Sequence, residues 1–227
     1  MITPQINNDM DKNMDEIKDI EIAEQPKPND VSGIHVQGHI KIFDPESGEI
    51  FIDKRNAIHY ENISEAIAYS LANKGQSYIY EMHFGNGGTS IDPTGIINYL
   101  PANTNTSNAN LYNPTFAKII DNTSALNPDP VRNKIEIRHT PGRVYSDLVI
   151  SCLLDYGEPS GQAAFDNSTN LNNTFTFDEL GLKSYNPDGE GKLLTHVVFH
   201  PVQKSLNRLL QIDYTIRAQS LTGFTEV

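Results

Sequence analysis

Regular alternation of apolar and polar side chains is the feature that most limits how this chain can fold. Apolar residues stand at every second position from Leu210 to Ile216, and the residues between them are polar. This period of two places the apolar side chains on one face of a β-strand and the polar side chains on the other. The same alternation occurs over residues 34–42. We therefore expect a fold built mainly from strands that each bury one face.

Further segments have the composition of strands and are separated by turn residues. Residues 44–48 (Asp-Pro-Glu-Ser-Gly) predict a hairpin turn, because proline presets φ and glycine supplies positive φ. The other expected strands lie at residues 50–52, 78–84, 134–139, 144–154, 193–200 and 209–217. Many strands and a single helix predict a mainly β fold, an antiparallel β-sandwich with long Asn-rich loops.

One segment has the periodicity of a helix. Apolar residues recur every four positions from Ile63 to Leu71, which predicts one packing helix at about residues 62–74. Asn62 is expected to cap its first turn. Gly75 is expected to end it in the left-handed conformation.

The first 32 residues differ in composition from the rest. They carry eight acidic residues against three lysines and no aromatic residue, and residues 25–30 have the composition of a linker. We therefore predict a flexible acidic N-terminal arm at residues 1–32 and a β-sandwich domain at residues 33–227. A short helix of the arm could dock on a neighbouring subunit. Its predicted contact residues are Met10, Met14, Ile17, Ile20 and Ile22.

Two polar segments are expected to be loops. Residues 97–132 are long and rich in Asn, Thr and Pro, and residues 166–173 have the same character. Loops of such length inside a compact domain usually have a function or are disordered. Both segments suit contact with a partner, and a floppy surface loop is the alternative. The interface residues predicted in them are Leu100, Asn105, Leu111, Tyr112, Asn170 and Leu171.

Charge and composition exclude several classes of partner. The formal net charge is −12 and no cluster of Lys and Arg occurs, so we expect no nucleic-acid binding. No segment approaches the ~20 apolar residues of a membrane-spanning helix, so we expect no membrane partner. The only cysteine, Cys152, lies in an apolar stretch, which predicts a buried thiol that packs as a small apolar side chain.

Histidine pairs raise the question of a metal site. His35 and His39 are four residues apart, as are His196 and His200. Such pairs could share a zinc ion on a helix. All four histidines lie in segments with the pattern of strands, where four residues span roughly 13 Å, too far for one ion. We predict no metal site and no cofactor.

The candidate catalytic acids also fail on expected geometry. Asp178 and Glu179 are neighbours on a predicted strand, so their side chains should point to opposite faces. Asp188 and Glu190 lie among turn residues. The glycine-rich residues 85–89 lack the lysine and the following helix of a phosphate-binding loop. We therefore predict no catalytic residue.

The order of short motifs is more informative than any one of them. A helix follows Asn56, residues 79–89 read Ile-Tyr-Glu-Met-His-Phe-Gly-Asn-Gly-Gly-Thr, residues 179–182 read Glu-Leu-Gly-Leu, and residues 199–204 read Phe-His-Pro-Val-Gln-Lys. Over about residues 34–217 this order resembles tailed-bacteriophage virion structural proteins of the collar, neck and tail-fibre-attachment type. The acidic arm and the expanded Asn-rich loop depart from that pattern.

The resemblance implies a β-sandwich, symmetric assembly and a place in the virion after synthesis in the host cytoplasm. We therefore expect a non-enzymatic structural protein, a collar, neck or tail-adaptor component that binds copies of itself and other virion proteins. One alternative is a capsid (head-decoration) protein or a receptor-binding fibre module, with Tyr99, Tyr112 and Phe116 stacking on sugars. A weaker alternative is a cell-wall glycan hydrolase that uses Glu179 or Asp188.

Overall fold

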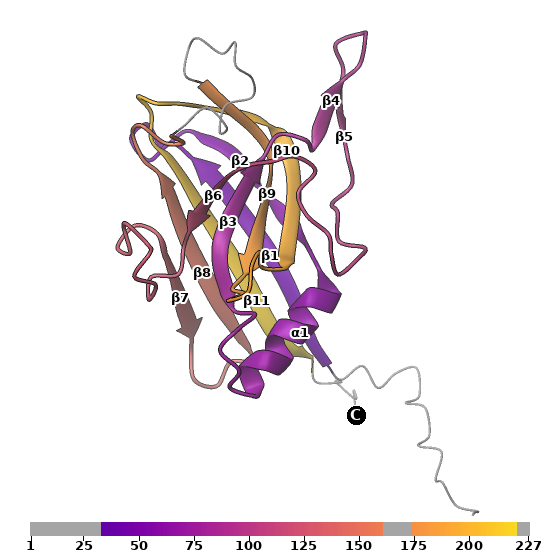
Figure 1. Ribbon diagram of the computed structural model, residues 1–227, viewed down its shortest axis with the longest axis vertical. Helices are drawn as coiled ribbons and strands as arrows, with labels where there is room; N and C mark the ends of the chain where they lie inside the picture. Colours follow the sequence, from indigo (N-terminus) through magenta and orange to yellow (C-terminus); the bar gives the residue numbers. More distant parts are fainter. Residues whose placement is uncertain (1–32, 161–173, 222–227) are drawn as a thin grey trace, which may run out of the picture. The chain divides into compact units, whose positions relative to one another are not determined.

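The computed structural model describes residues 33–160 and 174–221, which belong to one compact unit, Gly33–Leu221 (Figure 1). The predictions for the N-terminal arm and for the second polar loop, residues 166–173, lie outside the described residues. They concern Met10, Met14, Ile17, Ile20, Ile22, Asn170 and Leu171.

Antiparallel strands make up most of the described residues, as predicted. The strands are β1 (Gly33–Phe43), β2 (Ile50–Ile58), β3 (Ile79–Gly85), β4 (Thr89–Ile91), β5 (Ile97–Tyr99), β6 (Pro114–Ile119), β7 (Lys134–His139), β8 (Tyr145–Leu154), β9 (Thr174–Ser184), β10 (Leu193–Ser205) and β11 (Leu210–Leu221). The helix is α1 (Tyr60–Leu71). The prediction of a mainly β fold with one helix is confirmed.

The two layers expected of a sandwich are the two halves of one curled sheet. Nine strands follow each other in the order β6-β3-β9-β10-β2-β1-β11-β8-β7, and β4 pairs with β5 in a separate two-stranded sheet (Figure 1). Strand β2 belongs to both halves: Ile52 pairs with Ile42 of β1, whereas Ala57 pairs with His196 of β10. The sheet curls where β2 leaves β1. Gly38 lies there, and a Cβ at this position would come 1.8 Å from the Oδ1 of Asn56.

The core lies on the inner face of this sheet. Ile40 pairs with Tyr214, and Ile42 pairs with Ile212, so the alternating apolar residues of β1 and β11 meet in register. All four side chains are fully buried. Each contributes about 1.5–3 kcal/mol to folding through the apolar area removed from water.

Cys152 is part of this core, as predicted. Its side chain is fully buried. Burial raises the pKa of the thiol to about 12, because the charged thiolate would lose its hydration. The thiol therefore packs as a small apolar group.

The helix differs from its predicted limits. Helix α1 begins two residues earlier, because His59 caps it: the Nδ1 of His59 accepts a hydrogen bond from the Asn62 backbone N–H (3.3 Å). The Asn62 side chain is buried instead and donates to the first carbonyl of β10 (2.8 Å). Beyond the helix, Asn73 takes the left-handed conformation (φ 52°) that was predicted for Gly75. No helix among the described residues is long and apolar enough to cross a bilayer.

The segment predicted as one long loop contains two strands. Strand β5 pairs with β4 in a hairpin, and β6 pairs with β3 at one end of the large sheet. The prediction failed because Asn and Pro dominate the composition of residues 97–132, whereas only the short runs Ile97–Tyr99 and Pro114–Ile119 have strand character. These strands fix both ends of the Asn-rich segment.

Candidate assembly surfaces

A buried hydrogen bond joins β10 to β9, from the His196 ring to the Glu179 carboxylate. The Nε2 of His196 lies 3.0 Å from the Oε2 of Glu179, and both side chains are 0% exposed. The Oε1 of Glu179 accepts hydrogen bonds from the backbone N–H groups of Gly87 (3.0 Å) and Asn113 (2.8 Å). Its Oε2 also accepts from the N–H of Tyr112 (2.9 Å). Burial opposes ionisation, but the hydrogen bonds from His196 and the backbone hold the pKa of Glu179 below its ordinary value.

The same pair anchors the Asn-rich loop to the sheet. The Nδ1 of His196 accepts a hydrogen bond from the backbone N–H of Asn103 (2.8 Å). The ring of Tyr112 lies against the His196 ring at 5.6 Å, and the Tyr112 hydroxyl donates to the Pro101 carbonyl (2.7 Å). Leu111 is 4% exposed, so its side chain is used within the chain. The loop is thus held by polar contacts at both ends.

Asp178 binds the glycine-rich turn that follows β3. Its carboxylate accepts from the backbone N–H groups of Gly88 (2.9 Å) and Thr89 (2.9 Å) and from the Thr89 hydroxyl. Burial raises the pKa of Asp178 despite these bonds. Both carboxylates therefore bind the same turn, residues 87–89, through different backbone N–H groups.

The glycines of this turn explain the convergence. A Cβ on Gly87 would lie 2.7 Å from the Asn113 backbone nitrogen, and a Cβ on Gly88 would lie 2.9 Å from the Val198 side chain. Without side chains the turn approaches the sheet closely enough for consecutive N–H groups to reach both carboxylates. The close approach of the turn to the sheet, rather than strand alternation, therefore determines which backbone groups the two carboxylates bind.

The hairpin β4–β5 leaves the sheet at this turn and projects from the body of the unit (Figure 1). Its base is fixed by the Asp178 contacts and by the hydrogen bond from the Leu100 N–H to the Gly88 carbonyl (2.8 Å). The Tyr99 hydroxyl lies 3.2 Å from the Nδ1 of His200 on β10. At the far turn, the Asp92 carboxylate accepts from the backbone N–H groups of Thr94 (2.8 Å) and Ile96 (3.0 Å). The hairpin is therefore ordered at both ends.

Apolar side chains of the hairpin are open to solvent. Ile91 is 71% exposed, Ile96 61%, Tyr99 52% and the following Leu100 42%. We call Ile91 and Ile96 together the hairpin tip. The sequence offered a signal for it, since the two isoleucines flank the Asp-Pro-Thr-Gly turn at residues 92–95, but only Leu100 of this region was predicted at an interface.

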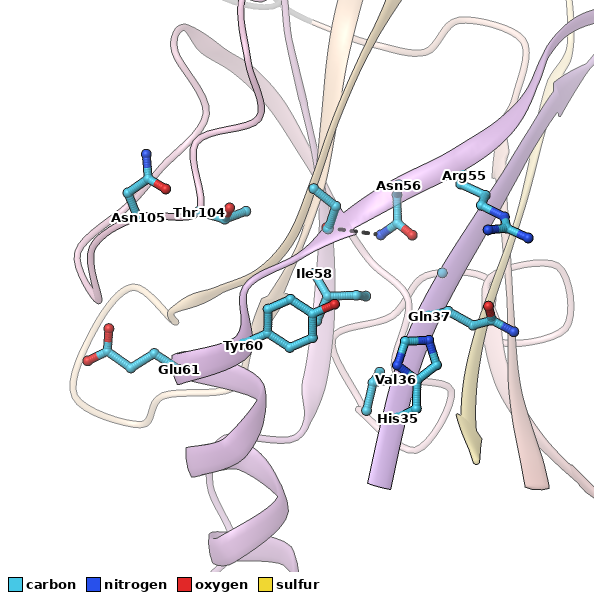
Figure 2. A pocket seen from close by; sticks show the side chains of 12 residues that line it. His35, Val36, Gln37, Arg55, Asn56, Ile58, Tyr60, Glu61, Thr104 and Asn105 are labelled. Atoms are coloured by element: carbon cyan, nitrogen blue, oxygen red, sulfur yellow. Dashed lines mark hydrogen bonds between the residues drawn. The ribbon is translucent and has the colours of Figure 1, made fainter. Parts of the chain in front are cut away.

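A groove opens where β1 and β2 separate (Figure 2). The pairing of the two strands stops at Gly38 and Asn56, and the following residues of β2 pair with β10 instead. The groove has a volume of about 600 Å³. Val36 and Ile58 give it an apolar floor, and its polar lining includes Arg55, Tyr60, Glu61 and Asn105.

Two groove residues bear on binding. Arg55 is exposed and forms no ion pair within residues 33–160 and 174–221. Asn105, which the sequence predicted at an interface, is exposed and lies on the wall opposite β1 (Figure 2). The groove therefore offers one cation and a short apolar floor to an extended partner segment.

The aromatic residues proposed for sugar stacking are held by their own chain. Tyr112 and Tyr99 bond through their hydroxyls, as described above. The Phe116 ring lies 5.9 Å from the Phe84 ring and is half-buried. Tyr112 remains 40% exposed. These contacts support anchoring of the loop.

The four histidines considered for a metal site differ in exposure and in their contacts. His39 is exposed and lies 2.8 Å from Asp53, and His35 is exposed. His196 is buried, whereas His200 is exposed. Among the residues that the structure describes, no group of three or more His, Cys, Asp or Glu side chains could hold a metal ion.

Comparison with known proteins gives no relative. No protein-family model matches the chain, and neither a curated protein nor a solved structure matches it. A functional proposal therefore depends on the residues of this chain.

Proposed function

We propose that this protein is a non-enzymatic structural component of a tailed-phage particle, of the collar, neck or tail-adaptor type, that binds copies of itself and other virion proteins. The observation that carries the proposal is the ordered hairpin β4–β5 with its exposed tip. The hairpin is a preformed binding element, and the groove between β1 and β2 is a second contact surface.

The exposed tip is costly for an isolated chain. Ile91 and Ile96 expose most of their apolar surface on a projecting element. Exposed apolar clusters on such elements commonly mark contact sites with other proteins. Burying either side chain against a partner gains about 1.5–3 kcal/mol. Because hydrogen bonds already order the hairpin, little of that gain is lost in fixing it on binding.

The buried acids support a structural role. Glu179 is fully buried, and its two oxygens accept four hydrogen bonds from the loop, the turn and His196. A catalytic acid must reach substrate, whereas this carboxylate faces its own backbone. Asp178 likewise holds the base of the hairpin. The two acids position the surfaces that bind partners.

Three of the four motifs that resemble those of phage virion proteins fall on one part of the sheet. Residues 79–89 form β3 and its turn, residues 179–182 lie on β9, and residues 199–204 lie on β10. These three strands are neighbours in the sheet. The resemblance is therefore concentrated in the framework that holds the projecting hairpin and the Asn-rich loop.

Two experiments test the proposal. Mass spectrometry of the purified phage particle should detect the chain, and its absence would end the proposal.

In the second experiment, the double substitution Ile91→Asp with Ile96→Asp should strongly reduce incorporation of the chain into the particle, because charge on the tip prevents its burial. Leu126→Asp with Val131→Asp is the matched control: these residues are 73% and 76% exposed but lie outside the hairpin. Equal incorporation of both variants would show that the hairpin tip is not the contact surface.

A further inference from the structure

Strand β7 ends the nine-stranded sheet. Within the part of the chain that the structure describes, it pairs with β8 only, and its other edge is open. The backbone N–H of Ile135 points away from β8 and donates to the Oδ1 of Asn122 (3.1 Å). Successive residues of a strand direct their N–H and C=O groups to alternate sides. Ile137 and His139 therefore also present their N–H and C=O groups at the open edge.

The side chains along this edge are exposed and of mixed character. Ile137 is 76% exposed. Its neighbours Glu136 and Arg138 carry opposite charges. Their side chains are 42% and 66% exposed and lie 3.4 Å apart. An open edge with an exposed β-branched residue is a surface on which another strand can pair. Charges of one sign would discourage pairing, but here the signs alternate.

We propose that β7 pairs antiparallel with β7 of a second copy of this chain, around a two-fold axis at Ile137. The inference rests on the assembly part of the proposed function and names its self-contact. The two Ile137 residues then exchange both backbone N–H···O bonds and bring their exposed side chains together. Each His139 N–H reaches the Ile135 carbonyl of the partner, and the Ile135 N–H remains bonded to Asn122. The sheets of the two copies become continuous.

Charge selects this register over its neighbours. An axis at Glu136 would place Glu136 opposite its own copy, and an axis at Arg138 would do the same for Arg138. Like charges directly opposite each other destabilise a strand pair. An axis at Ile135 would need the Ile135 N–H, which Asn122 already holds. With the axis at Ile137, each Glu136 faces an Arg138 on both sides of the axis.

The test uses the full chain and charge reversal at two positions. Sedimentation equilibrium over a range of concentrations should show a dimer of the unmodified protein. Glu136→Arg and Arg138→Glu each turn both cross-strand pairs into like-charge pairs, so each should weaken dimerisation by roughly tenfold or more. Mixing the two single variants should restore dimers, because each then meets the opposite charge on the other. The double variant Glu136→Arg with Arg138→Glu should dimerise like the unmodified chain.

Controls separate this interface from general effects of charge and folding. Lys74→Glu changes the net charge as much as Arg138→Glu does, at an exposed position after α1, and should leave dimerisation unchanged. Far-ultraviolet circular dichroism should show that every variant is folded. Rescue in the mixture also requires folded chains, so it excludes unfolding as the cause of weak dimerisation.

The possible failures are distinguishable. A monomer at every concentration overturns the inference, as do single variants that dimerise normally or a mixture that does not recover. If the chain forms oligomers whose stability is unchanged by these substitutions, the self-contact lies elsewhere, and the proposed function is not affected. A chain that dimerises as described but is absent from the phage particle would overturn the proposed function and leave the β7 pairing intact.

Discussion

Replacing Glu179 with Gln removes one acceptor oxygen and the charge from the most heavily bonded side chain of the described interior. The carboxylate accepts from two donors at each oxygen: Gly87 and Asn113 at Oε1, and Tyr112 and His196 at Oε2. A glutamine amide has one oxygen and one NH2 group. In either orientation its NH2 group faces two of these donors, which lose their acceptor.

The expected loss of stability follows from these contacts. Hydrogen bonds to charged groups contribute about 1.5–3 kcal/mol each, and the substitution removes two of the four that the carboxylate accepts. The site can relax in part, since the loop can move away from the sheet. We therefore expect Glu179→Gln to lower the free energy of unfolding by about 3–5 kcal/mol.

The effect should depend on pH with a defined sign. The folded-state pKa of Glu179 is lowered, so the unfolded chain takes up the proton first as the pH falls. The stabilisation by the carboxylate is complete above the unfolded pKa of about 4.3 and is lost as the pH falls through the lower folded pKa. The difference between the unmodified protein and the variant should therefore shrink below about pH 4.

Urea unfolding followed by circular dichroism measures this difference, and amide hydrogen exchange locates it. The N–H groups of Gly87, Tyr112 and Asn113 should exchange faster in the variant. Asp188→Asn is the control, because it makes the same acid-to-amide change at an exposed position, and it should leave stability unchanged. A loss below about 1 kcal/mol with these amides still protected would refute the anchoring role of Glu179.

Two further predictions concern the backbone and the core. Gly191→Ala should lower the free energy of unfolding by about 3 kcal/mol or more, because its Cβ would lie 1.5 Å from the Ser184 carbonyl oxygen. Gly75→Ala, where nothing lies within 4 Å of the new Cβ, is its control, and thermal denaturation should separate the two variants clearly. The Cys152 thiol, with its pKa raised to about 12, should resist a thiol reagent at pH 8 until the protein is unfolded in denaturant. Rapid stoichiometric labelling of the native protein would contradict its place in the core.

The local sequence pattern predicted most of the secondary structure and some of the residues of the core. Alternation over Leu210–Ile216 identified β11 and the face that it buries, and the apolar surroundings of Cys152 predicted a buried thiol. Successive side chains of a strand point to opposite faces, so a few consecutive residues are enough to show which face is buried. The same reasoning located α1 but predicted Asn62 as its cap, whereas His59, which has the extended backbone of a capping residue, caps the helix.

Contacts between distant segments were decided by the tertiary structure alone. The sequence identifies Asp178 and Glu179 as neighbours on a strand, but their partners at residues 87–89 and 112–113 are more than sixty residues away. The separation of β1 from β2, which forms the groove, and the open edge of β7 likewise depend on strand order in the sheet. Alternation determines which side of a strand is buried, whereas strand order determines which edges and loops remain available to a partner, because pairing joins residues without regard to their separation along the chain.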